Sequence, residues 1–445
     1  MKLDGLQHFL FIHVTIALTV ASRTPAILLM GEMSICRFLR PQRNPGKISV
    51  LRGACYFVSE FIKRIYSNSA VNPPNRGDLA AHSSNHMNDF TYPIPRRTFI
   101  RRAAVLAGSG ALASILPYRV HAAEKVTVVN SIRSLSNPYH ATWNQGGQAF
   151  ANAIGADYVT LVTEGDSEKG IADIRAVLAK TGGNMVLNVD PNDSPDARPI
   201  VEACVKAGAY VVTQWNKPAD LHPWDFNPYY VAHISFDGVR YGEETANALI
   251  KAIGGSGGIV ALGGILSNTP AIERKAGLQK ALDANPNVKL LDLQVANWKS
   301  SEAFSIVGSW LTRFGDQIKG IWAANDDMGT GALEALRAEN LAGKIPITGI
   351  DGIKLAVEAV RAGEFAATVS WDPYWQGSMG LAIPYAAKTG KFDPVKEPKS
   401  HREFYGTGSL VTKESADEFY KTHIESAPKI DFSDLWGRVT GQIRE

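Results

Sequence analysis

The sequence predicts an α/β protein of two doubly wound lobes, each with a parallel sheet and helices on both faces. From residue 125 onwards, short β-branched runs alternate with helix-length segments, which is typical of parallel sheets with crossover helices. The pattern restarts midway and has too many units for one small sheet. Polar and aromatic residues follow many of the predicted strands, at the edge where open α/β sheets bind ligands.

The spacing of apolar residues predicts each element. In the first half we expect strands at 125–130, 158–163, 184–189, 209–213 and 230–235, and helices at 138–154, 167–180 and 194–207. In the second half we expect strands at 258–262, 288–295, 318–323, 345–349 and 365–370, and helices at 242–253, 270–284, 300–314, 329–341 and 354–362. A strand at 402–411 and a capped helix at 412–422 complete the chain.

The break between the lobes falls near Ser235–Gly238, where a strand end meets a turn-prone Asp-Gly pair. We therefore expect an N-terminal lobe of residues 124–236 plus 372–403. The C-terminal lobe would contain residues 237–371 plus 404–445.

The front of the chain differs in charge from the body. Residues 1–123 contain 15 Lys and Arg against 5 Asp and Glu, a net charge of +10, whereas the remainder carries −7. An acidic body argues against nucleic acid as a partner. All nine Trp follow residue 123, so we expect the front segment to lie outside the packed body.

Residues 87–123 resemble an export signal. A basic region is followed by a short apolar run at 103–116 and by small residues where a signal peptidase would cleave. The paired Arg96 and Arg97, with Phe99 close behind, resemble the twin-arginine signal of bacteria. An ordinary basic helix start is the alternative. The signal predicts a periplasmic protein.

A signal peptide belongs at an N-terminus, yet this one is preceded by a long segment. Met87 stands just upstream of it, so we expect residues 1–86 to be an over-extended, disordered reading frame. The alternative is a second targeting segment, since Phe9–Val20 is apolar, although it is too short to span a bilayer.

Cysteine usage is compatible with export. Cys36 and Cys55 precede the signal, which leaves Cys204 alone in the body. A single cysteine cannot form an internal disulfide, and no Cys/His spacing of the metal-binding type appears. We expect Cys204 to be a buried, unreactive thiol, and neither a metal nor a cofactor is predicted.

A cluster of Asn and Asp ends one buried strand. The run Gly320–Ala324 leads directly into Asn325, Asp326 and Asp327, and a helix of small residues follows. Acceptors and donors at this position would lie at the mouth of the sheet. Capping of the next helix is the alternative, because Asn and Asp are good caps.

Similar polar and aromatic residues follow other predicted strands. They are Asn137, Tyr139, His140, Asp190, Asn192, Trp215, Asn216, Trp298, Asn325, Asp351 and Trp371. A single Trp at a strand end more often belongs to the core, and an Asp before Gly usually forms a turn. Their joint placement on one edge predicts a site, and flat aromatic faces beside Asp, Asn and Arg suit a sugar or polyol.

Three runs at these strand ends stand out: Ser134–His140, Asn325–Met328 and Gly349–Gly352. They resemble the hallmark stretches of periplasmic sugar-binding proteins of the ribose-binding type, the soluble receptors of ABC importers. The resemblance extends from Lys125 to Thr422 in preserved order. It implies two lobes, a ligand in the cleft between them and three hinge crossings, which we place near 235–237, 370–372 and 402–406.

The resemblance also implies roles for single residues. Tyr139 matches an aromatic that stacks on the sugar, with Asn137 beside it. Trp298 matches the aromatic on the opposite face of the sugar. Asn325 and Asp351 match pocket residues that bond to hydroxyls.

Arg274 matches the family's hydroxyl-binding arginine, whose forked guanidinium can reach two oxygens. The alternative is a surface ion pair with Glu273 or another neighbour, although isolated surface pairs contribute little stability.

Other positions depart from the ribose binders. His140 stands in place of a second aromatic, and Asp190 replaces an Asn. Trp215 and Asn216 stand in place of an Asp-Arg pair, and Trp371 in place of a Gln. These changes add aromatic bulk, so a different monosaccharide, a deoxy or methylated sugar, or a polyol fits better than ribose.

The implied mechanism is lobe closure around the ligand, without catalysis. A monomer would present its closed form to an ABC permease in the inner membrane, and a chemoreceptor is a further candidate partner. An NAD-dependent enzyme would need a Gly-rich turn after its first strand, whereas Gly254–Gly258 precedes a strand. A sugar-sensing regulator of the lac repressor type would need a helix-turn-helix where this chain has its signal.

Overall fold

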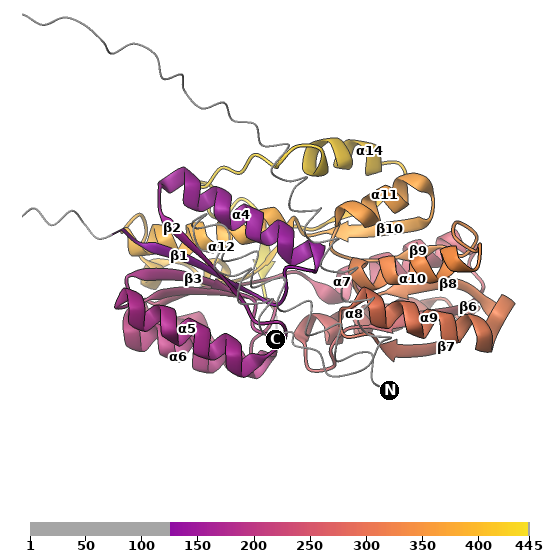
Figure 1. Ribbon diagram of the computed structural model, residues 1–445, viewed down its shortest axis with the longest axis horizontal. Helices are drawn as coiled ribbons and strands as arrows, with labels where there is room; N and C mark the ends of the chain where they lie inside the picture. The colour runs from indigo at the N-terminus through magenta and orange to yellow at the C-terminus, as the bar shows by residue number, and fades with distance from the viewer. Residues whose placement is uncertain (1–124, 444–445) are drawn as a thin grey trace, which may run out of the picture. The chain divides into compact units, whose positions relative to one another are not determined.

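The computed structural model describes residues 125–443. The predictions for residues 1–86 and 87–123 lie outside this range. Within it, the chain forms two separate sheets, one of seven strands and one of six (Figure 1). The predicted α/β class with two doubly wound lobes is confirmed.

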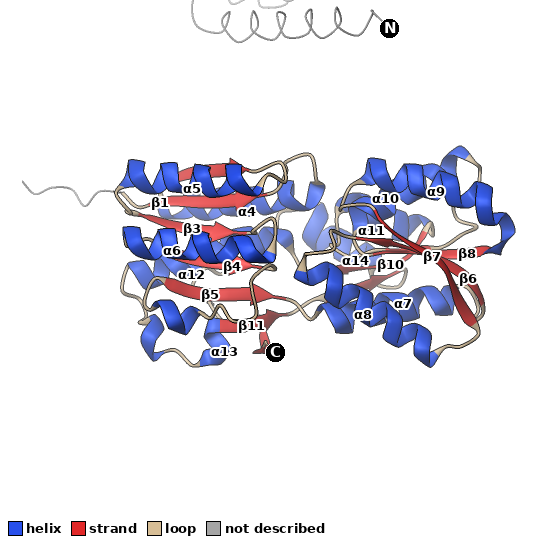
Figure 2. Cartoon of the chain, turned by 90° about the horizontal axis from the view of Figure 1, so that it is seen from below, coloured by secondary structure: helices blue, strands red, loops and turns tan. Residues whose placement is uncertain are grey.

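The first sheet has the strand order β13-β11-β5-β4-β3-β1-β2. Its strands are β1 (Thr127–Ile132), β2 (Asp157–Val162), β3 (Met185–Val189), β4 (Tyr210–Gln214), β5 (Tyr230–Ser235), β11 (Glu403–Gly406) and β13 (Val439–Gln442). Its helices are α4 (Pro138–Ile154), α5 (Ser167–Thr181), α6 (Ala197–Ala207), α12 (Pro373–Lys388) and α13 (Lys399–Arg402). Helix α4 packs against α12, and α5 packs against α6 (Figure 2).

The second sheet has the order β12-β10-β9-β8-β6-β7. Its strands are β6 (Gly257–Gly263), β7 (Val288–Val295), β8 (Ile318–Ala323), β9 (Ile347–Thr348), β10 (Phe365–Ser370) and β12 (Ser409–Thr412). The helices are α7 (Gly238–Ala252), α8 (Thr269–Ala284), α9 (Ser300–Phe314), α10 (Asp326–Ala338), α11 (Lys354–Ala362) and α14 (Ala416–Phe419).

Each sheet is parallel except at one of its edge strands. Strand β13 runs antiparallel to β11, and β12 runs antiparallel to β10. Counted along the chain, the remaining parallel strands follow the order 2-1-3-4-5-6 in the first lobe and 2-1-3-4-5 in the second. In such sheets the crevice for a ligand opens at the carboxyl ends of the strands, at the point where the strand order reverses. The central strands β3 and β5 are buried along their whole length, as is usual in a parallel sheet that is covered on both faces.

Many predicted elements begin and end where the sequence places them, including strand 288–295 and helix 300–314. Helix α7 begins four residues earlier than predicted, because the Asp237 side chain accepts a hydrogen bond from the Arg240 amide and caps it. Helix α12 was not predicted. It is buried on nearly all sides and contains Pro384, so it lacks the amphipathic period that identifies a surface helix.

The predicted strand at 402–411 is wrong as a single element. It is two strands in different sheets, because β11 pairs with β5 whereas β12 pairs with β10. The chain therefore crosses between the sheets in the short link after Gly406. The assignment of 404–445 to the C-terminal lobe needs the same correction, since β11 and β13 belong to the first sheet. The chain crosses once more between α14 and β13.

This last crossing is anchored at both ends. In the second lobe, the Tyr420 hydroxyl donates to Glu358 Oε1 at 3.1 Å. In the first lobe, the ring of Phe432 packs edge-on against Phe150 with centroids 5.1 Å apart, and Trp436 stacks on His401 at 4.4 Å.

Arg438 ties this segment to two other crossings. Its guanidinium forms a 2.8 Å ion pair with Asp372, a residue with 8% of its side chain exposed, and lies over the ring of Trp375. Its carbonyl accepts a hydrogen bond from the Thr407 amide at 2.9 Å. Asp372 lies in the second crossing between the sheets and Thr407 in the third, so one residue restrains both.

Replacing Arg438 by Ala should lower the free energy of unfolding by about 1 to 3 kcal/mol, because the buried Asp372 carboxylate loses its charged partner. Urea denaturation followed by circular dichroism measures this change. Lys396→Ala is the control, because Lys396 pairs with Asp393 on the exposed surface. Equal denaturation midpoints for the two variants would contradict the role given to Arg438.

Candidate functional site

A cavity of about 610 Å³ opens between the carboxyl ends of the two sheets. The residues predicted from the sequence that line it are Asn137, Tyr139, His140, Asp190, Trp215, Asn216, Arg274, Trp298, Asn325 and Asp351. Both lobes contribute to this set. Loops after β1, β3 and β4 supply one wall, and α8 with the loops after β7, β8 and β9 supplies the other.

Trp371 does not line the cavity, which differs from the prediction that it contacts the ligand. Its indole is fully buried behind the cavity wall, with ring centroids 5.5 Å from Trp215, 4.9 Å from Phe236 and 4.6 Å from Tyr241. The residue supports Trp215 from behind, which is the core role that a Trp at a strand end more often has.

The sequence did not identify several polar residues that also line the cavity. These are Arg133, Ser134, Ser136, Glu164, Asn268, Asn297, Lys299, Ser300 and Ser301, whereas Asp327, which the sequence placed at the mouth of the sheet, does line the cavity. Most lie in loops without a hydrophobic period, so no pattern distinguishes them from ordinary surface residues. Their position just after predicted strands was the signal that could have found Arg133 and Asn297.

Two tryptophans, one from each lobe, present indoles to the cavity. Trp215 follows β4 and Trp298 lies just after β7, and both have a φ of +63°. A left-handed backbone is uncommon for a bulky residue and persists only where the surroundings hold it. Each indole is held by a hydrogen bond, from Trp215 Nε1 to the Tyr139 hydroxyl at 2.8 Å and from Trp298 Nε1 to Asn268 Oδ1 at 2.9 Å.

Trp298 also depends on a glycine. A Cβ atom added at Gly264 would lie 2.0 Å from Cζ2 of the indole. The ring therefore lies directly on the backbone after β6, where only glycine leaves room. This contact and the bond to Asn268 fix the orientation of the aromatic face.

Hydrogen bonds in series fix Tyr139. Its hydroxyl accepts from Trp215 and donates to Gln376 Oε1 at 2.7 Å, and Gln376 Nε2 donates to the carbonyl of Trp371. Burial raises the pKa of Tyr139 well above its ordinary value. The ring is therefore a rigid, neutral surface.

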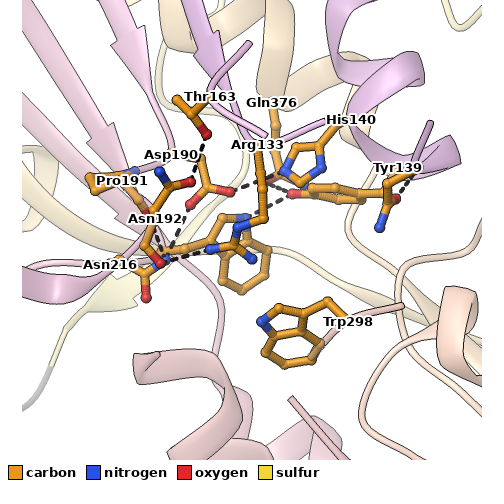
Figure 3. A network of polar contacts seen from close by, with 12 residues as sticks. Arg133, Tyr139, His140, Thr163, Asp190, Pro191, Asn192, Asn216, Trp298 and Gln376 are labelled. Carbon is orange, nitrogen blue, oxygen red and sulfur yellow. Dashed lines mark hydrogen bonds and ion pairs between the residues drawn. The ribbon is translucent and has the colours of Figure 1, made fainter. Parts of the chain in front are cut away.

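His140 and Asp190 face each other on the wall of the first lobe. His140 Nε2 lies 3.1 Å from Asp190 Oδ2, while Asn216 Nδ2 donates to Asp190 Oδ1 at 3.2 Å and to the carbonyl of Pro191 at 2.9 Å (Figure 3). The Asp190 carboxylate is thus bonded on both oxygens, and its orientation is set before any ligand arrives.

Arg274 lies at the centre of the opposite wall and is 4% exposed. Its Nη1 donates to the carbonyl of Ala324 at 2.7 Å and lies 3.9 Å from Asp351 Oδ1. The guanidinium carbon is 5.2 Å from the Trp215 ring centroid and 5.5 Å from that of Trp298, within the range of cation–π attraction. The alternative of a surface ion pair is therefore excluded by the burial of this side chain.

Close helix packing places Arg274 there. A Cβ atom at Gly242 of α7 would lie 2.3 Å from the carbonyl oxygen of Arg274, and one at Gly277 of α8 would lie 2.1 Å from that of Val239. The two glycines allow α7 and α8 to touch along their backbones. Glu273 points away from the cavity and accepts a hydrogen bond from the Gly238 amide.

The members of the Asn and Asp cluster that follows β8 have different structural roles. Asn325 Oδ1 accepts from the Met328 amide at 3.0 Å, so the capping alternative is correct for this atom, although Asn325 also lines the cavity. Asp326 is fully buried and accepts from the Thr368 hydroxyl and the Ile353 amide. Burial raises its pKa to about 7.

Asp351 faces Arg274 and is buried. Its backbone has a φ of +140°, and burial raises its pKa well above the ordinary value despite the nearby guanidinium. Arg274 therefore lies beside Asp351 on one wall of the cavity, and His140 lies beside Asp190 on the other.

A protein-family comparison identifies this architecture. The periplasmic binding protein domain matches residues 128–392. The chain belongs to the periplasmic binding protein family. The ribose-type resemblance seen in the sequence is confirmed by the relatives that follow.

Three similar members of the family are informative. The D-ribose/D-allose-binding protein of Pseudomonas aeruginosa is 30% identical over 64% of this chain and 90% of its own length. The xylitol-binding protein of Mycolicibacterium smegmatis is 38% identical over 38% of this chain, a match that spans 49% of that protein. The crystal structure of a twin-arginine translocation pathway signal protein from Burkholderia phytofirmans is 57% identical, with a TM-score of 0.71 over 72% of this chain and 99% of that one.

Residues 125–443 contain no helix that is long and apolar enough to cross a membrane. In the same range, no group of three or more His, Cys, Asp or Glu side chains is arranged to hold a metal ion. Cys204 is buried, and burial raises its pKa to about 12.

Replacing Arg274 by Ala should lower the free energy of unfolding at pH 7 by about 3 kcal/mol, because the Asp351 carboxylate is left buried without its compensating charge. Arg274→Lys should lose roughly 1 kcal/mol, since the charge remains but the forked geometry is lost. Urea denaturation measures both values. Lys280→Ala on the exposed face of α8 is the control and should leave the midpoint unchanged; an equal loss in all three variants would argue against a special role for Arg274.

Glu273 should make stability depend on pH. Burial raises its pKa from 4.5 to about 7, so its contribution to stability is complete below pH 4.5 and is lost as the pH rises to 7. Compared with Glu273→Gln, the unmodified chain should lose about 1 to 3 kcal/mol of unfolding free energy across that range. Denaturant titrations at pH 5 and pH 8 measure the difference, with Glu168→Gln on exposed α5 as the control. If the unfolding free energies of the unmodified chain and of Glu273→Gln change with pH in parallel, Glu273 is not the source of the pH dependence.

Proposed function

We propose that this chain is the periplasmic solute-binding component of an ABC importer and that it binds an uncharged monosaccharide or polyol between its lobes. The proposal depends mainly on one observation. Two indoles from opposite lobes line a single cavity together with two pairs of polar side chains, His140 with Asp190 and Arg274 with Asp351. Aromatic faces match the apolar faces of a sugar, and oriented carboxylates, amides and a guanidinium match its hydroxyls.

Unpaired donors support the same ligand class. Within residues 125–443, the buried nitrogens Arg274 Nε and His140 Nδ1 have no hydrogen-bond partner. A buried polar atom without a partner is costly, at about 1 to 3 kcal/mol. A hydroxyl both donates and accepts, so small shifts of these side chains around a hydroxylated ligand would provide the missing partners, and this would favour the bound, closed form.

The relatives narrow the candidate ligands. One is a D-ribose/D-allose-binding protein and another a xylitol-binding protein. The aromatic bulk of Trp215, which stands where ribose binders carry a polar residue, favours a polyol or a less polar sugar over ribose itself. The chain belongs to a family of periplasmic binding proteins, so we propose binding without catalysis.

Export by the twin-arginine route is part of the proposal. The paired Arg96 and Arg97 support it, as does the 57% identity to a solved protein described as a twin-arginine translocation pathway signal protein. The partner would be an inner-membrane permease; a chemoreceptor is a second possible partner.

A thermal-shift panel tests the ligand class. Xylitol, D-allose and D-ribose at 1 mM should be compared with D-glucuronate, a charged sugar. We expect at least one neutral compound to raise the melting temperature by several degrees, because a ligand that binds only the folded form stabilises it. D-glucuronate should give no shift. A shift from D-glucuronate alone would contradict the proposal of an uncharged ligand.

A further inference from the structure

Three consecutive residues at the start of α8 bond directly to the opposite lobe. Ser267 Oγ donates to Asp193 Oδ1, the Thr269 hydroxyl lies 3.0 Å from that of Ser194, and the Thr269 amide donates to Asn216 Oδ1 at 3.2 Å. These contacts join the loop after β6 and the start of α8 to the loops after β3 and β4.

Asn268 is the centre of this contact. Its Nδ2 donates to the carbonyl of Asn192 at 2.8 Å and to Asp193 Oδ1 at 2.9 Å. Its Oδ1 accepts from Arg133 Nη2 at 3.2 Å and from Trp298 Nε1 at 2.9 Å. A side-chain amide has two donor hydrogens and two acceptor lone pairs, so this one is fully used. Three of its four bonds cross from one lobe to the other.

The position of Asn268 makes this use unusual. It is the N-cap residue of α8, a place where Asn normally accepts a hydrogen bond from the helix it begins. Its side chain makes no such bond, although capping contributes about 1 kcal/mol to helix stability. The residue is 1% exposed, and the side chain is turned away from the helix and into the junction between the lobes.

Arg133 completes the junction from the first lobe. Its Nη2 donates to the carbonyl of Asn192 at 2.7 Å as well as to Asn268 Oδ1 (Figure 3). Arg133, Asn192 and Asn268 thus form a closed triangle of hydrogen bonds. Asn216 extends it to the ligand wall, since it bonds both the Thr269 amide and Asp190.

We propose that Asn268 is a positioning residue that couples lobe closure to the orientation of Trp298. Its bonds to the first lobe form only when the lobes meet, and the oxygen that accepts from Arg133 also holds the Trp298 indole over the cavity. Closure therefore fixes one aromatic face of the site, and a correctly placed indole favours closure. This inference rests on the proposed binding of a ligand between the lobes, yet its direct contacts can be tested without any ligand.

Hydrogen exchange followed by mass spectrometry on the full chain provides the test. The Thr269 amide donates across the cleft, so a peptide covering 265–272 reports whether the lobes are in contact. Exchange should be measured without sugar and with xylitol, D-allose or D-ribose at saturating concentration. The variant is Asn268→Ala, and Asn285→Ala at the other end of the same helix is the matched control, because Asn285 bonds only within its own turn.

We expect at least tenfold faster exchange at Thr269 in Asn268→Ala in every condition where the unmodified chain protects it. Exchange in 190–196 of the opposite lobe should rise with it, whereas Asn285→Ala should match the unmodified chain. Equal melting temperatures for the two variants would separate a lost lobe contact from general unfolding. Unchanged protection in Asn268→Ala, or no protection of Thr269 in the unmodified chain under any condition, overturns the proposal.

A paired substitution adds a rescue. N268D places a carboxylate against that of Asp193 and should open the junction. In the double variant N268D/D193N, the amide of residue 193 can donate to the carboxylate of residue 268. This variant should therefore recover part of the protection of the Thr269 amide. If the double variant exchanges as fast as N268D, the pairing with Asp193 does not hold the lobes and the proposal fails. Failure of all three sugars with intact protection of Thr269 would count against the proposed ligands and would leave the junction supported.

Discussion

The buried guanidinium of Arg274 is the interaction on which the site depends. A charge removed from water is stable only if it is paired and hydrogen-bonded. The chain provides this with the carbonyl of Ala324, the carboxylate of Asp351 and the faces of Trp215 and Trp298. The need to surround one cation explains why aromatic and acidic residues from distant parts of the sequence meet there.

The same constraint accounts for the strain in the site. Trp215, Trp298 and Asp351 all have positive φ values, a cost that a chain normally avoids. Each of these residues faces Arg274 and each is held by hydrogen bonds from its own lobe. Three strained residues and two unpaired buried nitrogens, Arg274 Nε and His140 Nδ1, therefore lie at the wall where a ligand would bind.

Much of the fold could be predicted because buried parallel strands and amphipathic helices have distinct periods. Strand 288–295 and helix 300–314 illustrate this. Helix α12 could not be predicted, since a helix buried on nearly all sides has no polar face. The strands around residue 406 were merged because the two loop residues between them carry no signal that one strand ends in one sheet and the next begins in another.

The residues of the site could be predicted only in part. Residues such as Tyr139 and Arg274 were found because the family resemblance placed them, and the structure brings them to one cavity. Trp371 was assigned to the cavity because it follows a strand, but its side chain points into the core. Asn268 carried no signal at all, because its sequence position is that of an ordinary helix cap. Whether such a residue caps its helix or bonds to another lobe depends on tertiary contacts that local sequence does not contain.

Direct contacts between the lobes stabilise the closed form in addition to the contacts that the ligand makes. The junction around Asn268 lies on the open side of the cavity, and the segment carrying Arg438 restrains the hinge on the other side. Both sets of bonds would add to the free energy of closure supplied by the ligand. The affinity of the site would then depend on residues that the ligand never touches.

A double-mutant cycle tests most directly whether one ligand is held by both lobes. Asp190→Ala removes a contact of the first lobe and Trp298→Ala one of the second, and titration calorimetry with the most stabilising sugar gives the binding free energies. If closure joins the two walls around one ligand, the losses should be non-additive by at least about 1 kcal/mol. Strictly additive losses would show that the two walls act independently and would contradict the account.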